Sequence, residues 1–210
     1  MPKKTGIFLV IAGAVLLLSA LLLFLYNRYE DAQAGLESES LLRDVQSAIE
    51  DRRTPPAAEE TPASSDSKMP AVMLEGYEYI GYLTIPSLDL QLPVMAQWDD
   101  FRLKLAPCRH FGSSRTDDLV IAAHNYKSHF GSLKDMQPGD TVQFTDIEGV
   151  VNNYVLEVLE TLDPTEVQAV KDSGYDLVLY TCTTDGSTRV VAFFNRPNEA
   201  ELPAESGIPE

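Results

Sequence analysis

The residues best suited to nucleophilic chemistry are a cysteine and an arginine near the end of the chain. The apolar, β-prone run Leu177–Cys182 ends in Cys182, and a short turn containing Gly186 follows. Arg189 then opens a second β-prone run. Two such runs joined by a short turn predict adjacent strands, which would place the thiol beside the guanidinium. A nearby cation favours the thiolate, which is the nucleophilic form of cysteine.

A proton-transfer partner has to come from three histidines. His124 has the best position, because it ends the apolar run 119–123, which is typical of a buried strand. His110 and His129 lie in polar sequence that indicates loops. A single histidine at a strand end is more often a structural residue than a base, so position alone does not assign a role to His124.

The two cysteines, Cys108 and Cys182, leave alternatives open. Cys182 could form half of a disulfide with Cys108, or be a small buried apolar residue. A domain of this size builds an adequate core without a disulfide. We therefore expect two free thiols.

The charge of the chain excludes some classes of function. The formal net charge is −16, and the acidic excess is spread along the chain without a Lys/Arg cluster. This charge distribution excludes a surface that binds nucleic acid and gives no attraction to anionic lipid headgroups. Scattered histidines do not form a metal-ligand set, and no Asp-x-Asp loop marks a calcium site. We expect neither a metal nor a cofactor.

The first 28 residues are predicted to anchor the chain in a membrane. The run from Gly6 to Tyr26 is apolar, and as a helix it would extend about 30 Å, the thickness of a bilayer core. Lys3 and Lys4 precede it, which keeps the N-terminus cytoplasmic and puts the rest of the chain outside. The alternative is a cleaved signal peptide, but the apolar run exceeds a typical signal-peptide core. We expect an uncleaved single-pass anchor.

Residues 29–70 are predicted to form a juxtamembrane stalk and a flexible linker. Residues 30–53 carry apolar positions among charges, which predicts a short amphipathic helix. A dimer contact is the alternative, but we favour a solvated helix. Residues 54–70 are rich in Pro, Ala, Ser and Glu without an apolar period, which is typical of a linker.

Residues 71–203 have the pattern of a mostly β domain, followed by a tail at 204–210. Trp98 to Leu105 has helical spacing, and Asp163 begins a capping-box pattern that predicts a helix to about Asp172. Seven or eight short strands and two or three short helices fit a closed, mostly antiparallel barrel. The runs assigned as strands are 79–85, 91–95, 119–123, 141–144, 154–162, 177–182 and 189–194.

An ordered set of motifs resembles the sortases, the cysteine transpeptidases of Gram-positive cell surfaces. The set consists of Leu-Tyr-Thr-Cys ending at Cys182, Arg189 on the next strand, and Ala-His-Asn around His124. Residues 80–94 resemble the first two barrel strands of the family, and residues 130–142 resemble the run after its histidine. The resemblance covers about residues 75–196. Residues 93–97 and the helix predicted from residue 163 favour a class B-like member.

The resemblance implies a role for each residue of the set. Cys182 attacks a backbone carbonyl and forms a thioacyl enzyme. His124 protonates the leaving amine and then serves as base for the incoming one, while Arg189 stabilises the oxyanion or holds the substrate backbone. Substrate contacts are implied for their neighbours Thr181, Asn125 and Thr183.

The resemblance also implies partners. These are surface proteins that carry a C-terminal sorting signal such as Leu-Pro-x-Thr-Gly, and an amine acceptor from a cell-wall precursor or a pilin lysine. Two alternatives remain open: a pilin-polymerising sortase, and a membrane-tethered β-barrel that binds peptides without catalysis. A papain-like peptidase would carry its cysteine early and on a helix, whereas Cys182 is late and on a predicted strand.

Overall fold

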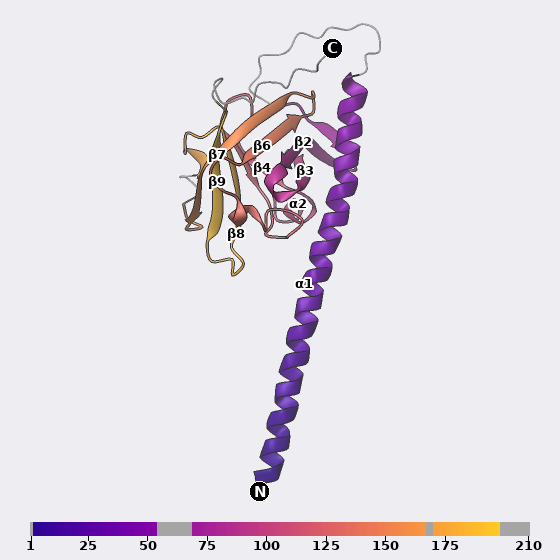
Figure 1. The fold of residues 1–210 in the computed structure, drawn as a ribbon. Coiled ribbons are helices and arrows are strands. Elements are labelled where there is room, and N and C mark those ends of the chain that lie inside the picture. Colours follow the sequence, from indigo (N-terminus) through magenta and orange to yellow (C-terminus); the bar gives the residue numbers. More distant parts are fainter. Residues whose placement is uncertain (1, 54–68, 167–169, 198–210) are drawn as a thin grey trace, which may run out of the picture.

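The molecule is a β-barrel with one long helix that lies against it and projects far beyond it (Figure 1). The computed structural model describes residues 2–53, 69–166 and 170–197. The predicted linker, apart from its last two residues, and the predicted tail therefore lie outside the described residues.

The described part of the chain contains nine strands, including all seven that the sequence predicts. The other two, β1 and β4, have only three and four residues, too few for an alternating pattern to be recognised. The strands are β1 (Val72–Leu74), β2 (Tyr77–Ile85), β3 (Leu90–Met95), β4 (Cys108–Phe111), β5 (Leu119–Ala122), β6 (Thr141–Asp146), β7 (Val151–Leu162), β8 (Leu177–Cys182) and β9 (Arg189–Asn195).

Eight of these strands close into a barrel, and β1 adds to the edge of β2. The order is β1-β2-β3-β4-β5-β8-β9-β7-β6, and a β2–β6 pairing closes the ring. Only β3–β4 and β5–β8 are parallel. Closure requires a glycine on β2, because a Cβ at Gly81 would lie 2.0 Å from the carbonyl oxygen of Thr145 on β6. The prediction of a mostly β, closed barrel is confirmed.

The short helical segments among the described residues include η1 (Pro86–Leu88), α2 (Arg102–Leu105) and η2 (Leu133–Asp135). Helix α2 is shorter than the predicted 98–105. The Asp99 carboxylate accepts hydrogen bonds from the backbone N–H groups of Phe101 and Arg102, at 2.9 and 2.7 Å. This cap satisfies the first free donors of the helix, so the helix begins only after Asp99.

The capping pattern at Asp163 also forms. The Glu166 carboxylate accepts a hydrogen bond from the Asp163 N–H at 2.7 Å, and the Asp163 carboxylate accepts one from the Thr165 N–H at 2.9 Å. Residues 167–169, in the middle of the predicted helix, lie outside the described residues. Gly174 has a φ of 76°, which suits the end of a helix.

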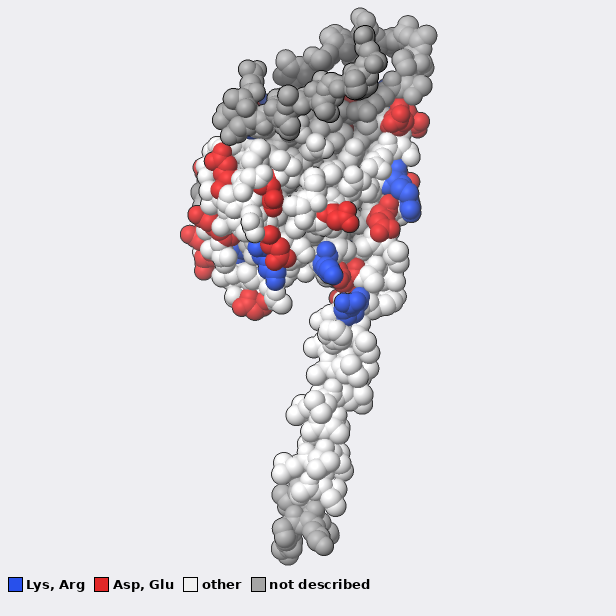
Figure 2. All heavy atoms as spheres, viewed as in Figure 1, with Lys and Arg blue, Asp and Glu red and all other residues white. Residues whose placement is uncertain are grey.

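Helix α1 (Pro2–Arg53) runs without a break through the apolar run and the segment after it. From Ile7 to Tyr26 most side chains are exposed, and the helix is long and apolar enough to cross a membrane. Figure 2 shows this part without charged side chains, which first appear where the helix reaches the barrel. The helix is therefore compatible with a single-pass anchor.

The second half of α1 packs against the barrel, so the interpretation of a solvated helix is wrong. Its buried residues recur every three or four positions, as on one face of a helix. Three of them, Leu41, Val45 and Ile49, share a core cluster with Tyr79 of β2 and Met95 of β3. Burial of this stripe stabilises the contact through the hydrophobic effect. The buried positions are Ala34, Ser38, Leu41, Leu42, Val45 and Ile49.

Candidate active site

The parallel strands β5 and β8 bring His124 to Cys182. Ala122 is the Cα partner of Tyr180, and His124 and Cys182 each lie two positions beyond their member of that pair. Because the carboxyl ends of parallel strands meet at one edge, the imidazole and the thiol lie at the same rim of the barrel.

Two hydrogen bonds continue this register beyond the last pair. The Ala123 N–H donates to the Tyr180 carbonyl oxygen at 3.2 Å. The Thr181 hydroxyl donates to the Ala123 carbonyl oxygen at 2.9 Å, and Thr181 is buried. The hydroxyl of this predicted substrate residue thus ties together the two backbone segments that carry His124 and Cys182.

Arg189 is the Cα partner of Cys182 across the antiparallel β8–β9 ladder. Its Nη1 donates to the carbonyl oxygens of Gly186 at 3.2 Å and Thr188 at 3.0 Å. These bonds hold the guanidinium against its own turn. Cys182 and Arg189 are therefore neighbours on adjacent strands, as the sequence predicts.

The turn between Cys182 and Arg189 is held by Thr183 and Asp185. The Thr183 N–H donates to the Thr188 carbonyl oxygen at 3.0 Å. The hydroxyls of Thr183 and Ser187 donate to the Asp185 carboxylate at 2.6 and 2.8 Å. These hydrogen bonds lower the pKa of Asp185 to about 2. The backbone and side chain of Thr183 are thus both committed to the turn, and Asn125 lines the cavity beside it.

One cleft of about 410 Å³ contains Cys182, His124 and Arg189 in its lining. Its volume suits a small side chain or a short extended peptide. Three carboxylates lie on its walls: Asp100, Asp163 and Glu166. The apolar part of the lining includes Leu103, Ala122, Leu162, Val170 and Val191.

The environment of His124 favours the neutral imidazole. Burial lowers its pKa, the Lys104 ammonium lowers it further, and the carboxylates of Asp100 and Glu30 oppose the shift. Removing a charged group from water disfavours the charged form, so burial is the dominant cause.

The structure places His110 in the lining of the cleft, although the sequence indicated that this residue lies in a loop. His110 lies on β4, its ring centroid is 5.0 Å from that of Trp98, and its Nδ1 is 2.6 Å from the Tyr180 hydroxyl. Burial lowers the pKa of His110 and raises that of Tyr180. All three side chains line the cleft. Sequence reasoning missed His110 because β4 is too short to show a periodic pattern.

His129 lies in a turn, as the sequence indicated, but its side chain is not exposed to solvent. It is fully buried, and its ring nitrogens have no hydrogen-bond partner among the described residues. Burial, with a contribution from His124, lowers its pKa to about 4. Cys108 is likewise fully buried, and burial raises its pKa to about 12. Cys108 and Cys182 are both free thiols, as predicted.

The comparison with protein families decides the family. A model of the Sortase domain matches residues 83–196, more than half of the chain. The chain belongs to the sortase family. The domain implies, in general, a cysteine transpeptidase. A comparison with curated proteins found no match.

Solved sortases share the fold of this sortase. Sortase C of Streptococcus pneumoniae has a TM-score of 0.54 and 20% identity, over 80% of this chain and all of that one. Sortase C1 of Streptococcus agalactiae has a TM-score of 0.52 and 22% identity, over 60% and 72%. Sortase A of Corynebacterium diphtheriae has a TM-score of 0.53 and 17% identity, over 85% and 96%. These identities support the fold alone, and the class B-like assignment stays a prediction.

Proposed function

We propose that this sortase is a membrane-anchored transpeptidase that cleaves a Leu-Pro-x-Thr-Gly-like sorting signal and joins the released acyl group to an amine. The observation that carries the proposal is that Cys182, His124 and Arg189 line a single cleft from the ends of three neighbouring strands. Such a cleft offers a nucleophile, an acid–base group and a fixed cation to one peptide bond.

In the first half-reaction, the Cys182 thiolate attacks the carbonyl carbon before the scissile bond. The C–N bond then breaks, and the His124 imidazolium donates its proton to the leaving amine. In the second half-reaction, an acceptor amine attacks the thioester and gives its proton to the neutral imidazole, and the thiolate leaves. Both residues return to their starting states.

Arg189 stabilises the negatively charged oxygen that forms in both half-reactions. Its two hydrogen bonds to the turn use only Nη1, whereas a guanidinium has five N–H donors. The anchoring therefore leaves donors for a substrate carbonyl while holding the cation in place. A cation positioned in advance at a partly dry site strongly stabilises developing negative charge.

The cleft and the helix support the proposed substrate and the proposed location of the enzyme. The apolar lining suits the Leu-Pro part of a sorting signal, and Thr181 belongs to the same lining. Asn125 and Thr183 line a smaller adjoining cavity that shares Cys182 and Thr181 with the cleft. Helix α1 would hold the barrel outside the cell, with the N-terminus in the cytoplasm. There the enzyme meets surface proteins and an amine acceptor from a cell-wall precursor or a pilin lysine.

The proposal is tested with the full chain in detergent micelles, a panel of fluorogenic sorting-signal peptides and an amine acceptor. We expect acceptor-dependent peptide joining that is abolished in Cys182→Ala. The matched control is Cys108→Ala, because Cys108 is buried outside the cleft. Joining that persists in Cys182→Ala contradicts the proposal, as does a wild-type chain that cleaves no peptide of the panel.

A further inference from the structure

The loop that carries His124 is tied together by its own backbone. The Phe130 N–H donates to the His124 carbonyl oxygen at 3.2 Å. The N–H groups of His129 and Gly131 both donate to the Tyr126 carbonyl oxygen, at 3.0 and 2.8 Å. Residues 124–131 therefore form a compact unit, and a displacement of its tip is transmitted to the backbone of His124.

The tip of this loop is attached to helix α1 by a contact between residues far apart in the sequence. The Asp31 carboxylate oxygen Oδ1 accepts a hydrogen bond from the Ser128 N–H at 3.1 Å. The Ser128 hydroxyl lies 3.0 Å from that oxygen and 3.1 Å from the Asp31 carbonyl oxygen. Hydrogen bonds to a charged acceptor are stronger than neutral ones.

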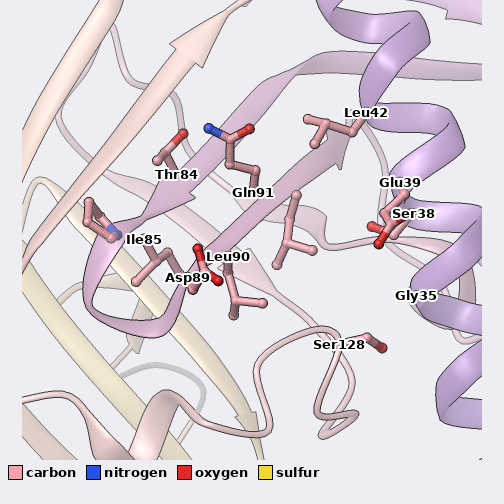
Figure 3. A pocket seen from close by; sticks show the side chains of 12 residues that line it. Gly35, Ser38, Glu39, Leu42, Thr84, Ile85, Asp89, Leu90, Gln91 and Ser128 are labelled. Atoms are coloured by element: carbon pink, nitrogen blue, oxygen red, sulfur yellow. The ribbon is translucent and has the colours of Figure 1, made fainter.

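The helix surface is shaped for this approach. Figure 3 shows Ser128 at its loop opposite the turn of α1 that carries Gly35. A Cβ at Gly35 would lie 3.2 Å from the Ser128 Cβ, so a larger residue would push the loop away. The absence of a side chain at Gly35 lets the loop reach Asp31.

The same loop borders both a cavity against the helix and the catalytic cleft. A cavity of about 530 Å³ lies between α1 and the loops of the candidate active site, and its lining includes Asn27, Arg28 and His124. His124 also lines the cleft with Cys182. The loop is thus held on one side by the helix turn just beyond the apolar run, and on the other it presents the imidazole.

We propose that Asp31 is a positioning residue, which fixes the His124 loop through Ser128 and makes the membrane helix part of the catalytic architecture. This rests on the proposed function, because it assumes that His124 transfers protons. The carboxylate never meets the substrate; it restricts where the imidazole lies relative to the thiol. Such geometry matters because a displacement of about 1 Å costs about a hundredfold in rate.

The first test compares Asp31→Ala, Asp31→Asn and Glu37→Ala in the full chain in detergent micelles. Asp31→Ala should lower kcat by about tenfold to a hundredfold, with KM for the peptide unchanged, because the cleft wall is intact. Asp31→Asn should retain most activity, since its amide oxygen can still accept from the Ser128 N–H. Glu37 is exposed on the same helix, and Glu37→Ala should have no effect.

The second test is independent of activity. Amide hydrogen exchange of Ser128 and of the bonded amides at 129–131 should be faster in Asp31→Ala than in wild type, and unchanged in Glu37→Ala. Unchanged exchange overturns the proposed attachment. Faster exchange with an unchanged kcat overturns the positioning role. If the wild-type enzyme is active, either of these results leaves the proposed function intact. If the wild-type enzyme is inactive, the proposed function is contradicted but the attachment of the loop is not.

Discussion

Cys182 and Arg189 face each other as Cα partners in the β8–β9 ladder, at the rim where the cleft opens. The turn between them is braced by hydrogen bonds to the Asp185 carboxylate. The guanidinium is in turn fastened to two carbonyl oxygens of the turn. The guanidinium is therefore held against the turn that follows Cys182 by a local structure that exists before any substrate binds.

We predict that Arg189→Lys lowers kcat/KM for peptide joining by about a hundredfold or more. Lysine keeps the charge but lacks the planar set of donors that can hold the turn and a substrate oxygen together. The measurement is steady-state kinetics of the full chain. Arg43→Ala, on the exposed face of α1, serves as the control. Near wild-type kinetics for Arg189→Lys would show that charge alone is sufficient.

The two cysteines should react very differently with iodoacetamide. Cys108 is fully buried, and burial raises its pKa to about 12, so little thiolate is available to react. Cys182 is partly exposed and lines the cleft. Mass spectrometry of the native protein should find the label on Cys182, and on Cys108 only after unfolding. Resistance of Cys182 until unfolding would favour a barrel that binds peptides without catalysis.

The pH profile of kcat/KM should have its acid limb below pH 6.5. The productive pair is a thiolate with an imidazolium, and free cysteine titrates at about 8.5, above free histidine at about 6.5. With that order of pKa values the population of the pair rises with pH only up to the pKa of the histidine, so the acid limb reports the histidine. Burial lowers the pKa of His124, so the acid limb shifts in the same direction. An acid limb centred above pH 7, measured with a peptide that does not titrate in this range, would contradict the assignment of His124.

Two neighbouring charges should move this acid limb in opposite directions. The Lys104 ammonium lowers the pKa of His124, whereas the Asp100 carboxylate raises it. Lys104→Gln should therefore shift the limb to higher pH, and Asp100→Asn should shift it to lower pH. Shifts of the two variants in one direction would mean that the titrating group is not His124.

His129 should make stability depend on pH. Its pKa is about 4 in the folded state, against about 6.5 in an unfolded chain. Between these values the unfolded state binds more protons, so stability falls as the pH falls. The loss between pH 7 and pH 5 is about 2 kcal/mol. Denaturant unfolding at both pH values should show a smaller loss in His129→Gln, and an equal loss in the two proteins would contradict this account.

Local sequence patterns were sufficient for much of the fold. The seven predicted strands form because alternating or fully apolar runs, bounded by turns, bury one or both faces. The missed strands, β1 and β4, are short and depend on their neighbours for hydrogen bonds. The burial of the α1 stripe was missed because an amphipathic pattern shows that a face is apolar, not which surface covers it.

By itself, the sequence determined the apolar helix and the neighbourhood of Cys182 and Arg189, which a short turn enforces. Only the tertiary structure decided that His124 joins them, because the parallel β5–β8 register links segments separated by more than fifty residues. The same holds for the contact between Asp31 and Ser128, which are 97 residues apart. Such contacts form where closure of the barrel and burial of apolar surface bring distant segments together, and no local pattern encodes that meeting.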